Sequence, residues 1–316
     1  MSWLGWQIDY LLLLQNFRDF SGHILDKFFL TITMFGEIAI PVLFICCLYW
    51  CINKKIGMYV LWCYTFGFLT NIFLKTTACI YRPWILDSRV HPLPSAIPAA
   101  TGYSFPSGHT AGAVSSWGAT VFAFWENKII RYLGITLVVL IMISRNYVGV
   151  HTPQDVIVSF VVGVCLLFLV NKLYNWVQKA ENRDLIITCS VTMLSVLLLL
   201  YVNLKSYPMD YLNGKILFDP TSVKIDTFAR IGGVLGVFYG WFLEKRFLNF
   251  DIGKGSFLRK LIRMVVGGVI LSFIYMYGKD YITSLVGLRT GLFVYQFVMG
   301  MFITYIYPLI FFKLKI

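Results

Sequence analysis

The chain has 316 residues, of which 58% are hydrophobic and 13% charged, and its mean hydropathy is +0.73. A soluble domain averages about 25% charged residues, so the composition excludes an ordinary soluble protein and predicts a polytopic membrane protein. The net charge of +12 does not indicate nucleic-acid binding, because the basic residues fall in short loops between apolar runs, as orientation signals do.

Apolar runs of membrane-spanning length follow one another along the chain. A span needs roughly 20 mostly apolar residues. We predict an all-α transmembrane helical bundle with about nine spans, at 28–51, 56–78, 109–125, 131–148, 155–178, 184–203, 228–247, 260–279 and 291–312. Ahead of them, residues 1–22 place Trp3 and Trp6 beside Asp9. This is typical of an amphipathic segment in the membrane interface, or else of a first span packed on the bundle.

Lys and Arg are unevenly divided between the loops that nine spans would place on opposite sides of the membrane. The loop 244–263 contributes much of the excess. Basic loops stay in the cytoplasm, so we expect a multi-pass protein of the cell membrane with its C-terminus inside. The polar motifs described next would then face the extracytoplasmic side.

Three short polar stretches interrupt the apolar sequence, and ionisable residues beside a bilayer are functional candidates. The first stretch ends the second predicted span with Lys75 and Arg82, followed by Pro83. Seven residues is about two helical turns, so both cations face roughly one side. The alternative is a pair of charges that reach out to lipid headgroups.

The second stretch, Pro106-Ser107-Gly108-His109, precedes a helix of small residues. Ser107 suits an N-cap, and free backbone N–H groups at a helix start bind anions. Gly108 permits close approach of the backbone. His109, held there, can donate a proton to a departing alkoxide, although a histidine at a span end is also a common interfacial residue.

The third stretch carries Arg145, His151 and Asp155. Arginine makes bidentate contacts with phosphate oxygens, and a short turn lets Arg145 and His151 face one ligand. Thr152 and Pro153 predict a helix start. This start brings the Asp155 carboxylate back to one imidazole nitrogen of His151 and leaves the other nitrogen free as a nucleophile. In the alternative, Asp155 only caps its own helix.

The three stretches together resemble the motifs of the type 2 phosphatidic acid phosphatase superfamily, which shares its site with vanadium haloperoxidases and bacterial acid phosphatases. The matching positions are Lys75-x6-Arg82-Pro83, Pro106-Ser107-Gly108-His109 and Ser144-Arg145-x5-His151-x3-Asp155. The likeness covers about residues 56–178. The long loop and the Tyr103-Ser104-Phe105-Pro106 approach look more like sphingoid-base phosphate phosphatases than like small bacterial lipid phosphatases.

The resemblance implies a role for each motif residue. His151 would be the nucleophile that forms a phosphohistidine, Asp155 would orient it, and His109 would protonate the leaving oxygen and then activate water. The phosphate would be held by Lys75, Arg82, Ser107, Gly108 and Arg145. No metal or other cofactor is expected, because the cations supply the charge that Mg²⁺ supplies elsewhere.

Three features outside the motifs leave alternatives open. The proline-rich loop 84–105 joins the first two motifs and would lie over the site as a lid or rim, or be a plain surface loop. Glu37, inside the first predicted span, would line the substrate path, pair with a motif cation or be structural. The last four spans contain small residues that allow close packing, within the chain or across a homodimer: Gly232, Gly233, Gly236, Gly240, Gly267 and Gly268.

The sequence therefore predicts three segments: an interfacial segment at 1–22, a phosphatase core bundle at 23–203 and additional C-terminal membrane helices at 204–316. We expect hydrolysis of a lipid phosphate monoester, with membrane lipids and the substrate as partners. Two rival functions remain. The same site would serve a lipid phosphotransferase, and a lipid-binding or scrambling protein would keep the motifs unused.

Overall fold

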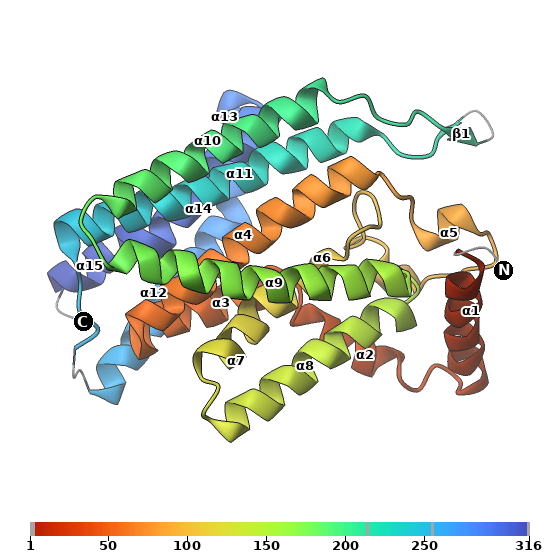
Figure 1. The fold of residues 1–316 in the computed structure, drawn as a ribbon, viewed down its shortest axis with the longest axis horizontal. Helices are drawn as coiled ribbons and strands as arrows, with labels where there is room; N and C mark the ends of the chain where they lie inside the picture. Colours follow the sequence, from red (N-terminus) through yellow and green to blue (C-terminus); the bar gives the residue numbers. More distant parts are fainter. Residues whose placement is uncertain (1–3, 213–214, 254–255, 315–316) are drawn as a thin grey trace. The chain divides into compact units, whose positions relative to one another are not determined.

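The computed structural model describes residues 4–212, 215–253 and 256–314 (Figure 1). The first three residues of the predicted interfacial segment, two residues of the basic loop and the last two residues lie outside this part. The chain forms two compact units, and each is built from separate stretches of sequence. Unit 1 comprises residues 1–42, 60–170 and 207–219; unit 2 comprises residues 43–59, 171–206 and 220–316.

Unit 1 is made of helices and one short hairpin. Its helical elements, three of which extend into unit 2 residues, are α1 (Gly5–Phe20), α2 (Asp26–Met34), α3 (Ala39–Cys47), α4 (Lys54–Ala78), α5 (Pro83–Leu86), η2 (Pro94–Ala96), α6 (Gly108–Ala113), η3 (Val114–Gly118), α7 (Ala119–Ala123), α8 (Lys128–Tyr147) and α9 (Pro153–Gln178). The antiparallel hairpin is β1 (Tyr211–Leu212) with β2 (Lys215–Ile216). In α1, Ile8 and Leu11 are buried together with Val90, so this helix packs on the protein. Its place in the membrane interface stays a prediction.

Unit 2 contains the remaining helices. They are η1 (Leu48–Ile52), α10 (Arg183–Leu204), α11 (Pro220–Leu243), η4 (Glu244–Leu248), α12 (Phe257–Phe273), η5 (Ile274–Gly278), α13 (Lys279–Val286), α14 (Leu288–Met301), η6 (Phe302–Ile306) and α15 (Tyr307–Leu314). Helix α11 lies between α10 and α14, as Figure 1 shows.

The glycines of α11 account for its close packing on α14. A Cβ on Gly232 would lie 2.2 Å from the Phe293 carbonyl oxygen, and one on Gly236 would lie 2.1 Å from that of Phe297. Gly267 of α12 is similarly crowded by Tyr307 and Trp50. These small residues are used inside the chain. A homodimer through the C-terminal helices stays a prediction.

The described residues contain fewer membrane-spanning helices than the nine expected. Six are long and apolar enough: Lys54–Leu86, Lys128–Tyr147, Pro153–Gln178, Arg183–Leu204, Phe257–Val286 and Leu288–Leu314. The pair Asp26–Met34 and Ala39–Ile52, bent by 48°, makes a seventh if it counts as one span. The expected spans 109–125 and 228–247 are helical but are not among the candidates. The first ends at Ala123, short of the length a span needs, and the second contains four charged residues, Arg230, Glu244, Lys245 and Arg246.

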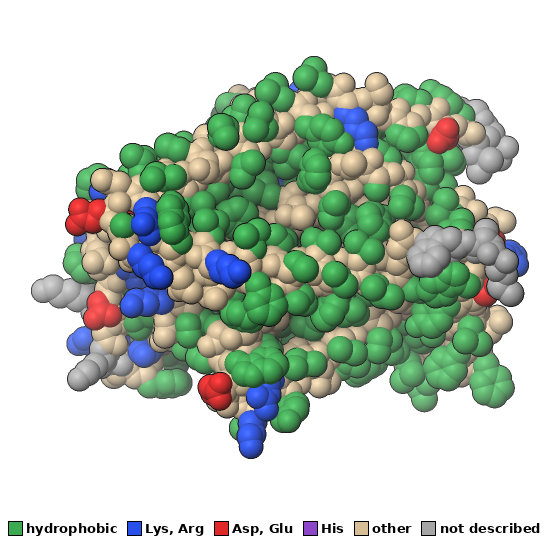
Figure 2. Space-filling view, viewed as in Figure 1, with side chains coloured by type: hydrophobic (Ala, Val, Ile, Leu, Met, Phe, Trp, Pro, Cys, Tyr) green, Lys and Arg blue, Asp and Glu red, His purple; other side chains and the backbone are tan. Residues whose placement is uncertain are grey.

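Exposed apolar side chains along the long helices fit a lipid environment. On α8 they include Ile129, Leu133, Val139 and Ile143, which are between 40% and 71% exposed. Figure 2 shows hydrophobic side chains over much of the visible face, with Lys and Arg gathered in a few places. Water disfavours so much exposed apolar surface, whereas acyl chains accommodate it.

The loop 84–105 is packed on the protein. Leu93, Ala96 and Ala100 form a buried cluster with Tyr147, Val148 and Val150, next to the third motif. The Leu93 N–H donates to the Val148 carbonyl at 3.0 Å. Gly149 has φ +77°, and a Cβ there would lie 3.0 Å from Pro92 Cα, so the turn needs glycine. The loop is thus held against the residues that precede α9.

Candidate active site

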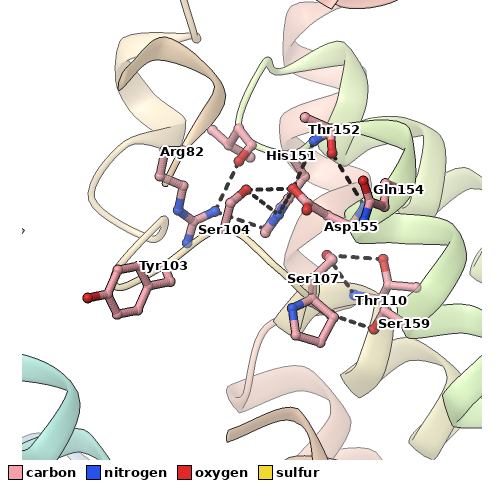
Figure 3. A network of polar contacts seen from close by, with 12 residues as sticks. Arg82, Tyr103, Ser104, Ser107, Thr110, His151, Thr152, Gln154, Asp155 and Ser159 are labelled. Carbon is pink, nitrogen blue, oxygen red and sulfur yellow. Dashed lines mark hydrogen bonds and ion pairs between the residues drawn. The ribbon is translucent and has the colours of Figure 1, made fainter. Parts of the chain in front are cut away.

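The start of α9 places Asp155 beside His151, as the spacing predicted. Thr152 Oγ1 accepts from the Asp155 N–H at 3.4 Å, and Asp155 Oδ2 accepts from the Thr152 N–H at 2.9 Å. This is a reciprocal capping box. The same Oδ2 lies 3.2 Å from His151 Nδ1 (Figure 3). Asp155 therefore caps its helix and contacts the imidazole at once, so the two alternatives do not exclude each other. That Asp155 orients His151 for catalysis stays a prediction.

Ser104 completes this arrangement and was not among the predicted site residues. Its Oγ–H donates to Asp155 Oδ2 at 2.5 Å and lies 3.4 Å from His151 Nδ1 (Figure 3). Ser104 is 0% exposed, Asp155 1% and His151 2%. A carboxylate buried this deeply needs several donors. The sequence signal was the position of Ser104 directly before Phe105-Pro106-Ser107, but nothing local pointed it toward Asp155.

Arg82 is tied to the other side of His151. Its Nη1 lies 3.0 Å from His151 Nε2 and donates to the Val150 carbonyl at 3.0 Å. Its Nε donates to the Gly102 carbonyl at 3.1 Å, and its Nη2 donates to the Thr101 carbonyl at 2.7 Å. With Nδ1–H directed to Asp155, the lone pair of Nε2 accepts a hydrogen bond from Arg82 Nη1, and the same guanidinium would attract a phosphate group.

Arg145 is almost fully buried and only partly satisfied. At 1% exposure, its Nη1 donates to Thr33 Oγ1 at 2.5 Å. Its Nε and Nη2 have no hydrogen-bond partner among the described residues. A buried hydrogen-bond donor without an acceptor destabilises the folded protein, and more so when the donor is charged. An oxyanion would satisfy both donors in the bidentate geometry that guanidinium favours.

His109 lies at the start of α6 and also lacks a hydrogen-bond partner on one nitrogen. Nε2 is buried and makes no hydrogen bond within the described part of the chain. The nearest carboxylate oxygen recorded for it is Glu37 Oε1, at 3.8 Å. Glu37 thus lies beside a motif histidine, a neighbour that differs from the three roles predicted for it.

The remaining predicted ligands lie around these groups. Ser107 Oγ caps α6, accepting from the Thr110 N–H at 3.4 Å and lying 3.1 Å from Thr110 Oγ1. Gly108 follows it, and Asn71 Nδ2 donates to the Pro106 carbonyl at 3.3 Å, which fixes the loop from α4. Lys75 Nζ, one turn after Asn71, donates to the Tyr103 carbonyl at 2.7 Å.

Direct contacts bring the three motifs together, because Arg82 Nη1 lies 3.0 Å from His151 Nε2 and the Ser107 N–H donates to the Asp155 carbonyl at 3.0 Å. Burial lowers the pKa of His151 well below its usual 6.5, and the charges of Arg82, Arg145, Lys75 and His109 lower it further. Those four groups come from all three motifs, and all of them belong to unit 1. These effects favour the neutral form of His151, which is the nucleophilic form of imidazole.

The geometry supports attack on a bound oxyanion followed by proton transfer. It provides an oriented neutral imidazole, a second histidine with an open nitrogen and a guanidinium with two unmatched donors. Among the residues that the structure describes, no three His, Cys, Asp or Glu side chains cluster where they could hold a metal ion.

Two family models match separate parts of the chain. The PAP2 superfamily matches residues 56–179, and the PAP2 superfamily phosphatase, transmembrane extension, matches residues 228–316. The first segment contains all eight predicted site residues, and the second contains α12 to α15 and most of α11. The matched transmembrane extension and the six candidate spans both indicate a multi-pass integral membrane protein.

Curated relatives agree with this assignment. An undecaprenyl-diphosphatase of Sulfolobus acidocaldarius is 34% identical over 37% of this chain and 54% of its own length. A phosphatidylglycerophosphatase B of Bacillus subtilis is 30% identical over 33% of this chain and 54% of its own length. A glucose-6-phosphatase catalytic subunit 1 of Haplochromis nubilus is 27% identical over 51% of this chain and 52% of its own length.

The chain spans about half the length of the curated relatives that it matches. No solved structure matches it. None of the three relatives is named for a sphingoid-base phosphate, so that leaning stays a prediction. The two matched segments show that the chain contains a PAP2 superfamily domain at 56–179 and the PAP2 transmembrane extension at 228–316.

Proposed function

We propose that the protein is a membrane phosphatase that hydrolyses a lipid phosphate monoester through a phosphohistidine. One observation carries the proposal. The lone pair of His151 Nε2, the two unmatched donors of Arg145 and the open nitrogen of His109 are the groups that in-line phosphoryl transfer needs. Relatives named for a lipid diphosphate and a phosphatidylglycerophosphate support a lipid substrate.

The first step transfers the phosphoryl group to the protein. His151 Nε2 attacks phosphorus with its lone pair while the bond from phosphorus to the ester oxygen breaks. The electron pair stays on that oxygen, which takes a proton from His109 and leaves as the lipid alcohol. The Asp155 carboxylate stabilises the imidazole as it gains positive charge, because it accepts the Nδ1–H at 3.2 Å.

The second step returns the protein to its starting state. His109, now neutral, takes a proton from water, and the water oxygen attacks phosphorus. The bond from phosphorus to Nε2 breaks, its electron pair returns to nitrogen, and inorganic phosphate is released. Protons and charges balance over the two steps with no other reactant.

The cations of the site stabilise the transferring group. Arg145, Arg82 and Lys75 would bind its equatorial oxygens, and the Gly108 N–H at the start of the α6 segment adds a neutral donor. Buried guanidinium groups act in a medium of low polarity, where their charge is more effective than in water. We therefore propose that the reaction does not require a metal ion.

The lipid environment suggests how the substrate reaches the site. Apolar side chains on α8 face outward, the last turn of α8 carries Arg145, and His151 follows shortly after the helix ends. An acyl chain would lie along such helices while the phosphate meets the motifs at the water boundary, on the extracytoplasmic side that the charge bias predicts. The C-terminus would be cytoplasmic.

Phosphate release from a panel of lipids in detergent tests the proposal. The panel contains phosphatidic acid, a sphingoid-base phosphate, phosphatidylglycerophosphate and a polyprenyl diphosphate, with His151→Ala as the inactive variant. His91→Ala is a matched control, because His91 is an exposed histidine in the loop 84–105. Activity of His151→Ala above a hundredth of the original would count against the covalent route. Transfer of phosphate to a labelled lipid acceptor instead of water would identify a phosphotransferase.

A further inference from the structure

The break between α2 and α3 lies against the helix that carries His109. It spans residues 35–38 and lies outside both matched segments. A Cβ on Gly36 would lie 3.0 Å from the His109 carbonyl oxygen and 3.2 Å from His109 Cβ, so glycine permits this approach. Trp117 Nε1 donates to the Phe35 carbonyl at 2.8 Å and fixes the break to η3.

Two side chains near this break contact the proposed catalytic machinery. Thr33 accepts from Arg145 Nη1, and Glu37 Oε1 lies 3.8 Å from His109 Nε2. That distance is too long for a hydrogen bond but short enough for a strong charge interaction. The Glu37 carboxylate therefore acts on the imidazole and leaves the Nε2 position open to a substrate oxygen. The Glu37 side chain is 41% exposed, which sets it apart from the buried Asp155.

The other groups around His109 disfavour its protonated form. Burial is the largest effect that lowers the pKa of His109, and Arg145 and Arg82 lower it further. Glu37 acts in the opposite direction without cancelling these effects, so the pKa of His109 stays low, at about 4. His109 also interacts electrostatically with His151, just before α9. A general acid must carry a proton when the leaving group departs. His109 therefore needs a nearby negative charge, and Glu37 supplies one.

We propose that Glu37 is a positioning residue for the acid–base catalyst. Its carboxylate favours the protonated form of the His109 imidazole and directs it at the leaving oxygen, against the effect of the two buried arginines. This inference rests on the proposed function. It assigns a role to a segment that lies before the matched domain, and it makes the bent helix pair a part of the active site.

Leaving groups that differ in their need for an acid test this role. An alkoxide needs a proton as it leaves, whereas p-nitrophenolate leaves readily without one. We expect Glu37→Gln to lower kcat about 10-fold or more for a lipid alkyl phosphate at pH 7, and less than threefold for p-nitrophenyl phosphate. The alkaline limb of the kcat profile for the lipid should move about one pH unit or more toward acid. Glu126→Gln is the matched control, because Glu126 is an exposed carboxylate of unit 1 outside the site.

Equal losses on both substrates, or no loss on either, would overturn the inference. In a His109→Ala background, Glu37→Gln should have no further effect, and an additional tenfold loss there would also contradict it. If Glu37→Gln does not fold, Glu37→Asp carries the test. It keeps the charge, so the alkaline limb should stay within about half a pH unit, and a full-unit shift would reject the proposal. Absence of phosphate release by the unmodified protein would instead reject the proposed function itself.

Discussion

Removing the Ser104 hydroxyl tests whether the buried carboxylate at the start of α9 controls the nucleophile. In Ser104→Ala, Asp155 Oδ2 keeps the Thr152 N–H and His151 Nδ1 but loses the donor at 2.5 Å. The carboxylate becomes less well held, and the imidazole loses the contact at 3.4 Å that helps to fix its plane. Ser104 donates none of the bonds that we assign to the phosphate.

The structure sets the size of the expected effect. A hydrogen bond to a charged group contributes about 1.5–3 kcal/mol, and both partners here are essentially inaccessible to solvent. If that energy serves to orient His151, kcat should fall about 10- to 150-fold. KM should change less than about threefold, because the phosphate ligands are intact.

Steady-state phosphate release measures kcat and KM, and rapid trapping of the phosphoenzyme follows the attack by His151. Ser116→Ala is the control, since Ser116 is equally buried but donates at 2.7 Å to the Gly112 carbonyl of its own helix. A kcat within twofold of the original would refute the reasoning. So would a loss confined to KM, because it would mean that Ser104 acts on binding and not on the nucleophile.

Four further predictions follow from the same contacts. Arg145→Lys keeps a charge but loses Nε and the planar fork, so KM should rise about 10-fold or more, and an unchanged KM would show that those donors do not meet substrate. The lowered pKa of His151 keeps the imidazole neutral in mildly acidic solution, so the acid limb of kcat/KM should lie below pH 6.5; a limb at or above that value would contradict the assignment. Treatment with EDTA should leave phosphate release unchanged, and a loss restored by a divalent cation would reject the metal-free proposal. In unit 2, Arg246→Met removes the partner of the buried Asp184 carboxylate, at 2.6 Å and 2.7 Å, and should lower the free energy of unfolding by about 1–3 kcal/mol, measured in detergent.

Local patterns predicted the parts of the site that neighbouring residues build. The pairing of His151 with Asp155 depends on one helix start, and the N-cap role of Ser107 depends on another, so short spacing was sufficient. The helical class was confirmed for the same reason, since apolar length alone predicts it. The count of nine spans was not confirmed. The helical stretch at 109–125 is too short for a simple span, and the stretch at 228–247 contains charged residues.

Contacts between distant residues could not be predicted in this way. Ser104 reaches Asp155 across 51 positions, and Thr33 reaches Arg145 across 112. Nothing in their own segments marks Ser104 or Thr33 as part of a site. Their roles depend on how α2, α8 and the loop 84–105 pack together, which a single sequence does not specify.

The two unmatched donors of Arg145 have a consequence for how the protein would behave during sustained turnover. A buried guanidinium with two unmatched donors attracts any tetrahedral oxyanion, and inorganic phosphate is both the product and such an ion. Strong product inhibition should therefore accompany the reaction, with orthovanadate acting as a tighter competitor. The steady rate would depend on how quickly phosphate is cleared from the surrounding water.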